Sequence, residues 1–394
     1  MDYISAKEAA EKWGITPRRV QQYCKDGLIP GAARLGRAWG IPRDAEIPGK
    51  MTPKDREETA SGPKRIPMLL LTQSYSHGEC LEYIRAIPDE DDRSIAMGEY
   101  YYFSGQAEMC TQIMVPYLDS PDLMLRYSAC LLCAFANLSG GHINLARFAM
   151  KNVQQLLSQS LQKDSNPETL AVGIFAETAT AVLLHLPHPE IPPLEDHLRY
   201  LPGGLRLWGC YILAHKAYLE GNYERALAFA DISLAGCPFK FPISAIYLHL
   251  AAIMALMSMK RTDKARKHME AAWELARQDG LIQPFVEHYG LLQGMVEVFF
   301  KNDYPEVYQR IVAEHRRFFT GWRKIHRPET RREVADNLTA VEFTIAMLAN
   351  RGWTNKEISA HMGLTANTVK HYISIIYQKL GISNRNQLHK YMLR

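Results

Sequence analysis

Helix start and stop signals are densest over residues 338–393, and this stretch limits the fold of the chain more than any other. Thr339 precedes an apolar run and Glu342 follows three residues later, which is the pattern of a capping box. Thr354 and Glu357 repeat the pattern. Glycines suited to the left-handed residue that ends a helix stand at Gly352, Gly363 and Gly381. The stretch is therefore predicted to form four short helices.

The predicted third helix of this stretch, residues 365–380, has two different faces. Apolar side chains recur at helical spacing and are expected to pack inward: Val369, Ile373, Ile376 and Leu380. The opposite stripe consists of hydrogen-bonding side chains: Asn367, Lys370, His371, Ser374 and Gln378. Such a stripe is either a solvated helix face or a surface that contacts base edges in a DNA major groove. The short connection at 361–364, the caps and the basic surroundings favour the DNA surface.

Four motifs of this stretch resemble the LuxR-type (GerE) DNA-binding domain over its whole length. They are Leu338-Thr339-x-x-Glu342, Thr354-Asn355-Lys356-Glu357-Ile358, Thr365-x-x-Thr368-Val369-Lys370 and Lys379-Leu380-Gly381-Ile382-x-x-Arg385. The resemblance implies that the third helix enters the major groove, that the start of the second helix holds phosphates, and that the fourth helix pairs protomers.

The resemblance assigns roles to individual positions of this sequence. Residues expected to face the bases are Lys370, His371 and Ser374, and Asn367 on the same polar stripe is expected to be a further DNA contact. Residues expected to face the DNA backbone are Thr354, Asn355, Lys356, Thr365 and Thr368. Dimer contacts are expected from Leu380, Arg385 and Leu388. Two positions depart from the family pattern: Val341 replaces an arginine and Ser359 replaces an alanine, which changes a local ion pair and a small packing site.

Residues 1–46 are predicted to form a second small domain. Ser5 and Glu8 make a capping box, and Thr16 caps a second helix that has Pro17 at its first position. Residues 34–39 are expected to form a basic hairpin around a glycine turn. Helix, turn, helix and hairpin together are the order of a winged helix-turn-helix.

Three motifs of this domain resemble the excisionase/MerR-like domain: Ser5-x-Lys7-Glu8-Ala9-Ala10, Ile15-Thr16-x-Arg18-Arg19-Val20 and Arg34-x-Gly36-Arg37-x-Trp39-x-Ile41-Pro42. The resemblance implies a second helix in a major groove and a wing near phosphate or the minor groove. Expected DNA contacts are Arg18, Arg19, Gln22, Arg34 and Arg37. The alternative is a small domain that contacts proteins.

A flexible tether is predicted over residues 47–67, because proline, glycine and charged residues dominate there. Residues 68–319 are expected to be helical repeats. The run 221–226 resembles the tetratricopeptide pattern, and its small residue Ala226 has equivalents at Cys110, Ala146, Ala265 and Val307, with one degenerate unit near residue 186. The stretch 272–285 resembles the helical repeats of MalT-type regulators.

Charge separates these regions. Residues 1–66 carry 13 basic and 9 acidic side chains, residues 320–394 carry 12 and 5, and residues 67–319 carry 21 and 28, which gives +4, +7 and −7. Basic ends suit a polyanion that would repel the acidic middle. The basic linker 320–337 is expected either to contact phosphates or to be a solvated hinge. The absence of an apolar leader or a long apolar run predicts a cytoplasmic chain without membrane contact.

The sequence gives little support for a metal site, a nucleotide-binding site or a catalytic site. His185, His188 and His197 lie near prolines without further metal ligands at a suitable spacing, and Cys130-x-x-Cys133 lacks a second pair. No phosphate-binding Gly-x4-Gly-Lys-Ser/Thr motif and no catalytic triad occurs. We therefore expect no enzyme activity, no metal and no cofactor.

The sequence thus predicts a mainly α protein, in which tetratricopeptide-like repeats lie between two small helix-turn-helix domains. The expected function is that of a bacterial-type transcriptional regulator that binds double-stranded DNA. Its repeats would sense a small-molecule or protein effector, with RNA polymerase and a second copy of the chain as further partners. The alternative is a repeat-based scaffold in which only one terminal domain binds DNA.

Overall fold

The computed structural model describes residues 3–13, 16–25, 29, 32–35, 38–43, 45, 65–162, 166–187, 190–236, 241–326 and 338–392. The chain divides into two compact units, residues 1–64 and residues 65–394. Most of the predicted tether lies outside the described residues. Its last three residues, 65–67, belong to the larger unit, so the tether ends earlier than predicted.

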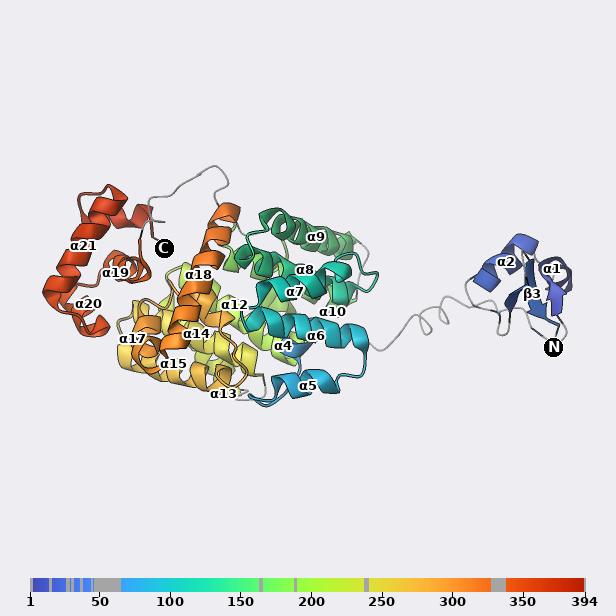
Figure 1. Ribbon diagram of the computed structural model, residues 1–394, viewed down its shortest axis with the longest axis horizontal. Helices are drawn as coiled ribbons and strands as arrows, with labels where there is room; N and C mark the ends of the chain where they lie inside the picture. Colours follow the sequence, from blue (N-terminus) through green and yellow to red (C-terminus); the bar gives the residue numbers. More distant parts are fainter. Residues whose placement is uncertain are drawn as a thin grey trace. The chain divides into compact units, whose positions relative to one another are not determined.

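The smaller unit combines two helices with a three-stranded antiparallel sheet (Figure 1). Its elements are β1 (Tyr3–Ser5), α1 (Ala6–Trp13), α2 (Pro17–Lys25), β2 (Ala33–Leu35) and β3 (Ala38–Pro42). The Ser5 amide donates to Glu8 at 2.8 Å and the Glu8 amide donates to the Ser5 hydroxyl at 3.3 Å, which confirms the predicted capping box. The hairpin forms as β2 and β3, and β1 adds a strand that was not predicted. The sequence predicts that the two helices end at Gly14 and Gly27, and both glycines lie outside the described residues.

All regular secondary structure in the described residues of the larger unit is helical. Its helices are α4 (Leu69–Thr72), α5 (Cys80–Ala86), α6 (Glu90–Phe103), α7 (Ala107–Met114), η1 (Val115–Tyr117), α8 (Leu123–Ser139), α9 (Ile143–Gln162), α10 (Pro167–Leu183), α11 (Leu194–His197), η2 (Leu198–Tyr200), α12 (Gly203–Leu219), α13 (Tyr223–Gly236), α14 (Pro242–Ser258), α15 (Thr262–Ala276), α16 (Gln283–His288), α17 (Met295–Asp303), α18 (Pro305–His326), α19 (Ala340–Asn350), α20 (Asn355–Met362), α21 (Ala366–Leu380) and η4 (Arg385–Lys390). Among the described residues, no helix has both the length and the apolar character that a membrane span requires.

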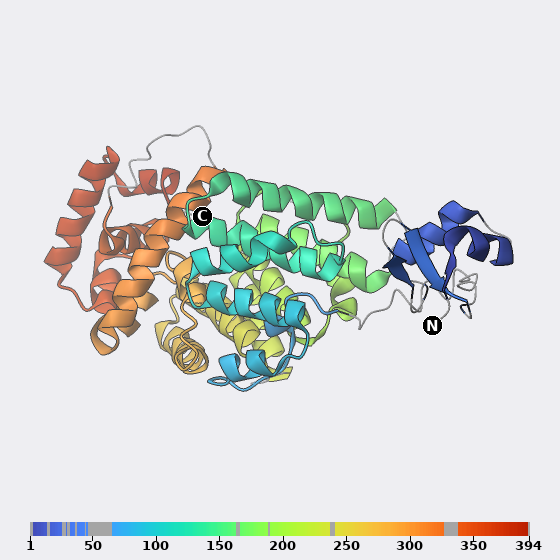
Figure 2. The ribbon, with the colours of Figure 1, turned by 45° about the vertical axis from the view of Figure 1, so that its right-hand side comes forward.

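Consecutive helices of this unit pack in pairs, such as α6 with α7, α8 with α9, α12 with α13 and α14 with α15. Figure 2 shows the helices coloured from cyan to yellow stacked side by side. Five turns between helices each contain a residue with positive φ, at positions 105, 141, 185, 221 and 260. The turns therefore recur at similar intervals along the chain. The predicted small residues Cys110, Ala146, Ala226 and Ala265 are fully buried, each on the second helix of its pair, whereas Val307 is partly exposed.

The degenerate unit predicted near residue 186 has only one full helix. α10 ends at the turn that contains His185, and the short helices α11 and η2 stand where the second helix of a pair would be. Pro187, Pro192 and Pro193 lie in this segment. Proline cannot donate the helical hydrogen bond, which explains why no long helix forms here.

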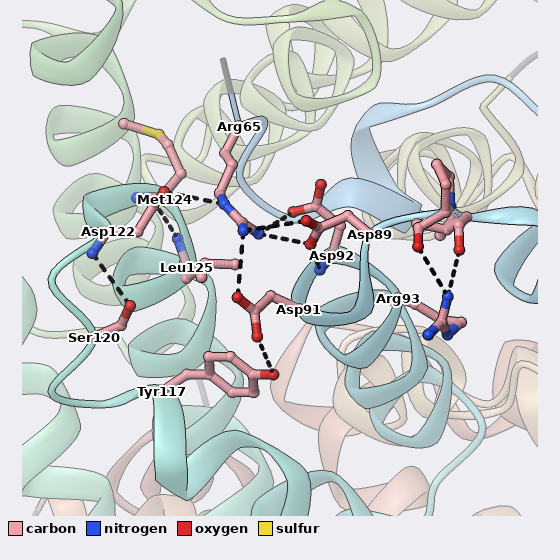
Figure 3. Close-up of polar contacts among 12 residues, drawn as sticks. Arg65, Asp89, Asp91, Asp92, Arg93, Tyr117, Ser120, Asp122, Met124 and Leu125 are labelled. Carbon is pink, nitrogen blue, oxygen red and sulfur yellow. Dashed lines mark hydrogen bonds and ion pairs between the residues drawn. The ribbon is translucent and has the colours of Figure 1, made fainter. Parts of the chain in front are cut away.

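Arg65 fixes the start of the larger unit (Figure 3). Its guanidinium lies 3.0 Å from Asp89, 2.9 Å from Asp92, 3.3 Å from Asp91 and 3.2 Å from Asp122. Asp89 and Asp122 are the N-caps of α6 and α8. One arginine therefore joins the starts of two helices, and the chain is already packed at a position where a tether was predicted.

The boundary before the last domain also differs from the prediction. α18 continues to His326, so the first residues of the predicted linker 320–337 are helical. Gly321 packs so closely on α8 that an added Cβ would lie 2.1 Å from the carbonyl oxygen of Leu138. Trp322 is buried and its indole donates to the carbonyl of Leu183 at 3.3 Å. The remaining linker residues, including Arg327, Arg331 and Arg332, lie outside the described residues.

Candidate nucleic-acid interface

The last domain contains three α-helices and the 3-10 helix η4, where four helices were predicted. Both predicted capping boxes form: Thr339 and Glu342 begin α19, and Thr354 and Glu357 begin α20. Gly363 ends α20 in the left-handed conformation with φ 64°, and Thr365 caps α21 two residues later. These signals produce the tight turn between α20 and α21 that a helix-turn-helix requires.

The two faces of α21 are separated as the sequence predicted. Val369, Ile373, Ile376 and Leu380 are buried in the domain core. The opposite side chains Asn367, Lys370, His371, Ser374 and Gln378 are all exposed. Within the described part of the chain, no side chain of this polar face forms a hydrogen bond or ion pair with another residue. The face therefore keeps its donors and acceptors available for a ligand outside the chain.

The expected phosphate contacts lie at the starts of α20 and α21. The Thr354 hydroxyl accepts the Glu357 amide at 3.2 Å, and the Thr365 hydroxyl accepts the Thr368 amide at 3.1 Å. Each cap pairs one amide, and the other amides in the first turn of each helix have no partner inside the helix. Such amides attract anions. Lys356 is exposed in the first turn of α20, where it adds a positive charge.

A buried ion pair holds α21 against α19. The Lys379 ammonium lies 2.7 Å from the carboxylate of Glu342, whose side chain is only 6% exposed. Burial raises the pKa of Glu342, but the bonds from Lys379 and Thr339 outweigh it and the net pKa is lowered. Val341, which replaces the arginine of the family pattern, therefore does not leave Glu342 without a basic partner.

The residues expected to contact a second copy of the chain lie inside the domain. Leu380 and Leu388 are fully buried, and Arg385 donates to the carbonyl oxygens of Ala349 and Trp353. All three contribute to the core of the domain in this single chain, and the expected dimer contact stays a prediction.

The domain also packs against the helical array (Figure 1). The ring of Phe343 lies 5.6 Å from the ring of Phe319, and an added Cβ at Gly290 would lie 2.8 Å from Phe343. Thr344 donates to Glu297 at 2.5 Å. Arg351 donates to the hydroxyl groups of two tyrosines, Tyr218 at 2.9 Å and Tyr223 at 3.0 Å. This contact surface leaves the polar face of α21 exposed.

Lys260 makes a further contact from an unusual backbone position. It occupies the turn between α14 and α15 with φ 59°, where the corresponding turns have Gly105, Gly141 and Gly221. A left-handed conformation is unfavourable for a residue with a side chain. The Lys260 ammonium lies 2.8 Å from Glu357 and 5.8 Å from the centre of the Trp353 ring. Its bonds, with those from Thr354, lower the pKa of Glu357 to about 2.

Sequence reasoning did not find this docking surface. Lys260, Gly290 and Arg351 contact partners that are far away in the chain, and helical periodicity describes only neighbours within a few turns. The one available signal was a lysine at position 260, where equivalent turns carry glycine.

The smaller unit exposes part of its predicted interface. Arg18, Arg19 and Gln22 lie exposed on α2, and Arg34 lies exposed on β2 with its guanidinium 5.8 Å from the centre of the Trp39 ring. Arg19 also donates to the hydroxyl of Tyr23 at 3.1 Å. Arg37 lies outside the described residues.

The histidines considered as metal ligands take other contacts. His185 packs its ring against Trp322 at 5.3 Å, and the Nδ1 atom of His197 lies 3.0 Å from the carbonyl oxygen of Pro193. His188 lies outside the described residues.

Comparisons with known proteins support the last domain most strongly. Residues 336–392 match the family described as bacterial regulatory proteins, luxR family. A probable transcriptional regulatory protein, SgaR of Hyphomicrobium methylovorum, is 44% identical over 50 residues, which are 13% of this chain and 24% of that protein. The chain is also 29% identical over 141 residues to the HTH-type transcriptional regulator MalT of Klebsiella pneumoniae subsp. pneumoniae, covering 32% of this chain and 16% of that protein.

The chain thus spans less than a quarter of the length of the curated relatives that it matches. No solved structure is significantly similar to it. The expected excisionase/MerR-like domain receives no support from these comparisons. The family match, the two capping boxes and the exposed polar face of α21 identify residues 336–392 as a LuxR-family helix-turn-helix domain.

Proposed function

We propose that the protein is a transcriptional regulator that binds double-stranded DNA through α21. The exposed polar face of this helix carries the proposal, because its side chains suit the mixed donors and acceptors of a major groove. Lys370, His371 and Ser374 contact bases, and the starts of α20 and α21 contact the flanking phosphates. The family match of residues 336–392 supports the same function.

The smaller unit provides a second DNA contact in this proposal. Arg18 and Gln22 lie on the exposed face of α2, and Arg34 lies on the hairpin. Two tethered binding modules increase the overall affinity only when both can reach their sites at once. The helical array acts as the sensor, because an effector that prefers one arrangement of the helices changes the affinity of the domain docked on it.

Selection of bound duplexes from a random DNA pool tests the function. The full chain is incubated with the pool at physiological salt, and bound DNA is sequenced over several rounds. We expect enrichment of one sequence motif, since base contacts distinguish sequences and phosphate contacts do not. A pool that stays random while the chain is folded would contradict sequence-specific regulation and would favour a protein scaffold.

A further inference from the structure

Two adjoining cavities lie inside the helical array. About 580 Å³ at the first and about 430 Å³ at the second is not filled by protein atoms, and both volumes include space that is open to solvent. Phe135, Leu183 and Glu287 line both cavities, so the two meet at these residues. The walls of the first cavity are mostly aromatic and include Phe319 and Phe343. Small-molecule sites typically have mostly apolar walls with a few polar groups, and both cavities have walls of this kind.

A chain of hydrogen bonds leaves one free acceptor on the wall of the first cavity. The Nδ1 atom of His288 lies 2.7 Å from the carbonyl oxygen of Pro284, so this nitrogen carries a proton. The other nitrogen of His288 then accepts from the hydroxyl of Tyr211 at 2.8 Å. The same hydroxyl accepts from Nδ1 of His215 at 3.1 Å. The Nε2 atom of His215 therefore presents a lone pair.

This lone pair has no partner in the chain. The Nε2 atom of His215 is buried and forms no hydrogen bond, and the residue is only 3% exposed. Burial lowers the pKa of His215 well below its ordinary value, so the imidazole is neutral and its Nε2 atom accepts rather than donates. Leaving a buried acceptor unpaired costs about 1–3 kcal/mol. A ligand that donates an N–H or O–H to His215 would remove this cost.

The charge of the cavity indicates which kind of donor fits. Glu287 accepts hydrogen bonds from Tyr102, from Tyr247 at 2.8 Å and from Gln283 at 3.3 Å, but it has no cationic partner among the described residues. Burial raises its pKa to about 7, with these three bonds acting in the opposite direction. No lysine or arginine lines either cavity. An anionic ligand would find no opposite charge here, whereas a cation would find one carboxyl group and several aromatic rings.

We propose that this cavity binds a small organic amine as its ammonium ion. One N–H donates to the Nε2 atom of His215, the positive charge is compensated by Glu287, and the apolar part of the ligand packs against Phe319 and Phe343. This inference rests on the proposed sensor function and specifies the ligand class. Phe343 belongs to the LuxR-family domain, so a ligand in this cavity contacts both the array and the DNA-binding domain.

Calorimetry of the full chain with three probes of equal size tests the proposal. Benzylamine is a cation, benzyl alcohol is neutral and benzoate is an anion at pH 7.5. We expect benzylamine to bind at least about tenfold more tightly than either of the other two, as a charged hydrogen bond predicts. No DNA is present, so the result does not depend on whether the chain binds DNA.

Two variants locate the site. Glu287→Gln removes the charge but keeps a hydrogen-bonding side chain, and it should weaken benzylamine binding about tenfold. Glu177→Gln is the matched control, because Glu177 is a buried carboxyl group that lines neither cavity. Equal affinity for all three probes, or no binding by any of them at millimolar concentration, would overturn the proposal. So would benzylamine binding that both variants weaken equally.

Discussion

The two ends of the chain carry small domains, one of helices and a sheet and one of helices alone in its described residues, that are stabilised in different ways. The N-terminal domain has a core of its own, which among the described residues consists of eight buried side chains that include Ala9, Val20 and Ile41. The LuxR-family domain shares one continuous core with the helical array, through residues such as Phe343 and Trp353. A domain that is packed on the array can be affected through its contacts with the array, whereas the described residues of the smaller unit form a separate core.

The largest expected effect concerns this difference in core structure. Phe343→Ala should lower the unfolding free energy of the larger unit by about 3–5 kcal/mol, because a ring packed between two regions is lost. Hydrogen exchange with mass spectrometry at increasing urea concentrations follows each unit separately. Val20→Ala is the counterpart in the smaller unit and should affect residues 1–64 alone. Unchanged hydrogen exchange in α19 of the Phe343→Ala variant would contradict the claim that the LuxR-family domain and the helical array share one core.

The two units should also respond to pH in opposite directions. The pKa of Glu287 is raised to about 7 in the folded chain from an ordinary value of 4.5. The unfolded chain therefore releases this proton first, and the larger unit loses stability as the pH rises from about 4.5 to about 7. Hydrogen bonds from Ser5 lower the pKa of Glu8 below its ordinary value of 4.5, so the smaller unit gains stability as the pH rises toward about 4.5, below the range in which the larger unit loses stability.

Glu287→Gln checks the sign of this effect. The variant should remove a fall on the order of 1–3 kcal/mol from the pH profile of the larger unit. Urea unfolding at several pH values between 4 and 8 gives the profile. A profile that Glu287→Gln does not alter would mean that the pKa of this carboxyl group is the same in the folded and the unfolded chain, which would contradict its raised value.

DNA binding by the smaller unit is the next comparison. Replacing Arg18 and Arg34 by alanine should weaken binding of the full chain to duplex DNA and lower the slope of log affinity against log salt by about one per residue. Lys7→Ala removes an exposed positive charge from α1 and should have little effect. Anisotropy titrations from 50 to 300 mM salt give the slopes. Equal slopes for the double variant and Lys7→Ala would assign the smaller unit to protein contacts instead.

The smallest expected effect concerns the turn at Lys260. Lys260→Gly relieves the left-handed backbone, and Lys260→Ala does not, although both lose the contact with Glu357. The glycine variant should therefore be more stable than the alanine variant by about 1 kcal/mol. Both should show faster amide exchange at the start of α20. Equal stability of the two variants would show that position 260 carries no backbone strain.

Local signals in the sequence predicted local structure well. Thr339, Thr354 and Gly363 each cap a helix through hydrogen bonds to residues no more than four positions away, and all three caps form where predicted. The predicted tether and hinge were wrong at their edges, because Arg65 and Trp322 are held by partners far along the chain. Contacts between distant residues depend on how the helices stack, and periodicity does not encode that.

The same limit applied to the candidate site. Helical spacing predicted the exposed face of α21. It did not predict that Leu388 is buried or that Arg385 donates a hydrogen bond to a main-chain carbonyl group. A family pattern marks the positions that matter, and only the packing shows whether a side chain faces the domain core or a partner.

The central claim is that α21 reads DNA sequence, and the affinity ratio of Lys370→Ala tests it most directly. Anisotropy titrations compare the duplex obtained by selection with a random duplex, for the wild-type chain, for Lys370→Ala and for Lys390→Ala as the exposed-lysine control. We predict that Lys370→Ala loses about 1–3 kcal/mol of binding to the selected duplex and much less to the random duplex, and that Lys390→Ala leaves their ratio unchanged. An unchanged ratio for Lys370→Ala would contradict the account.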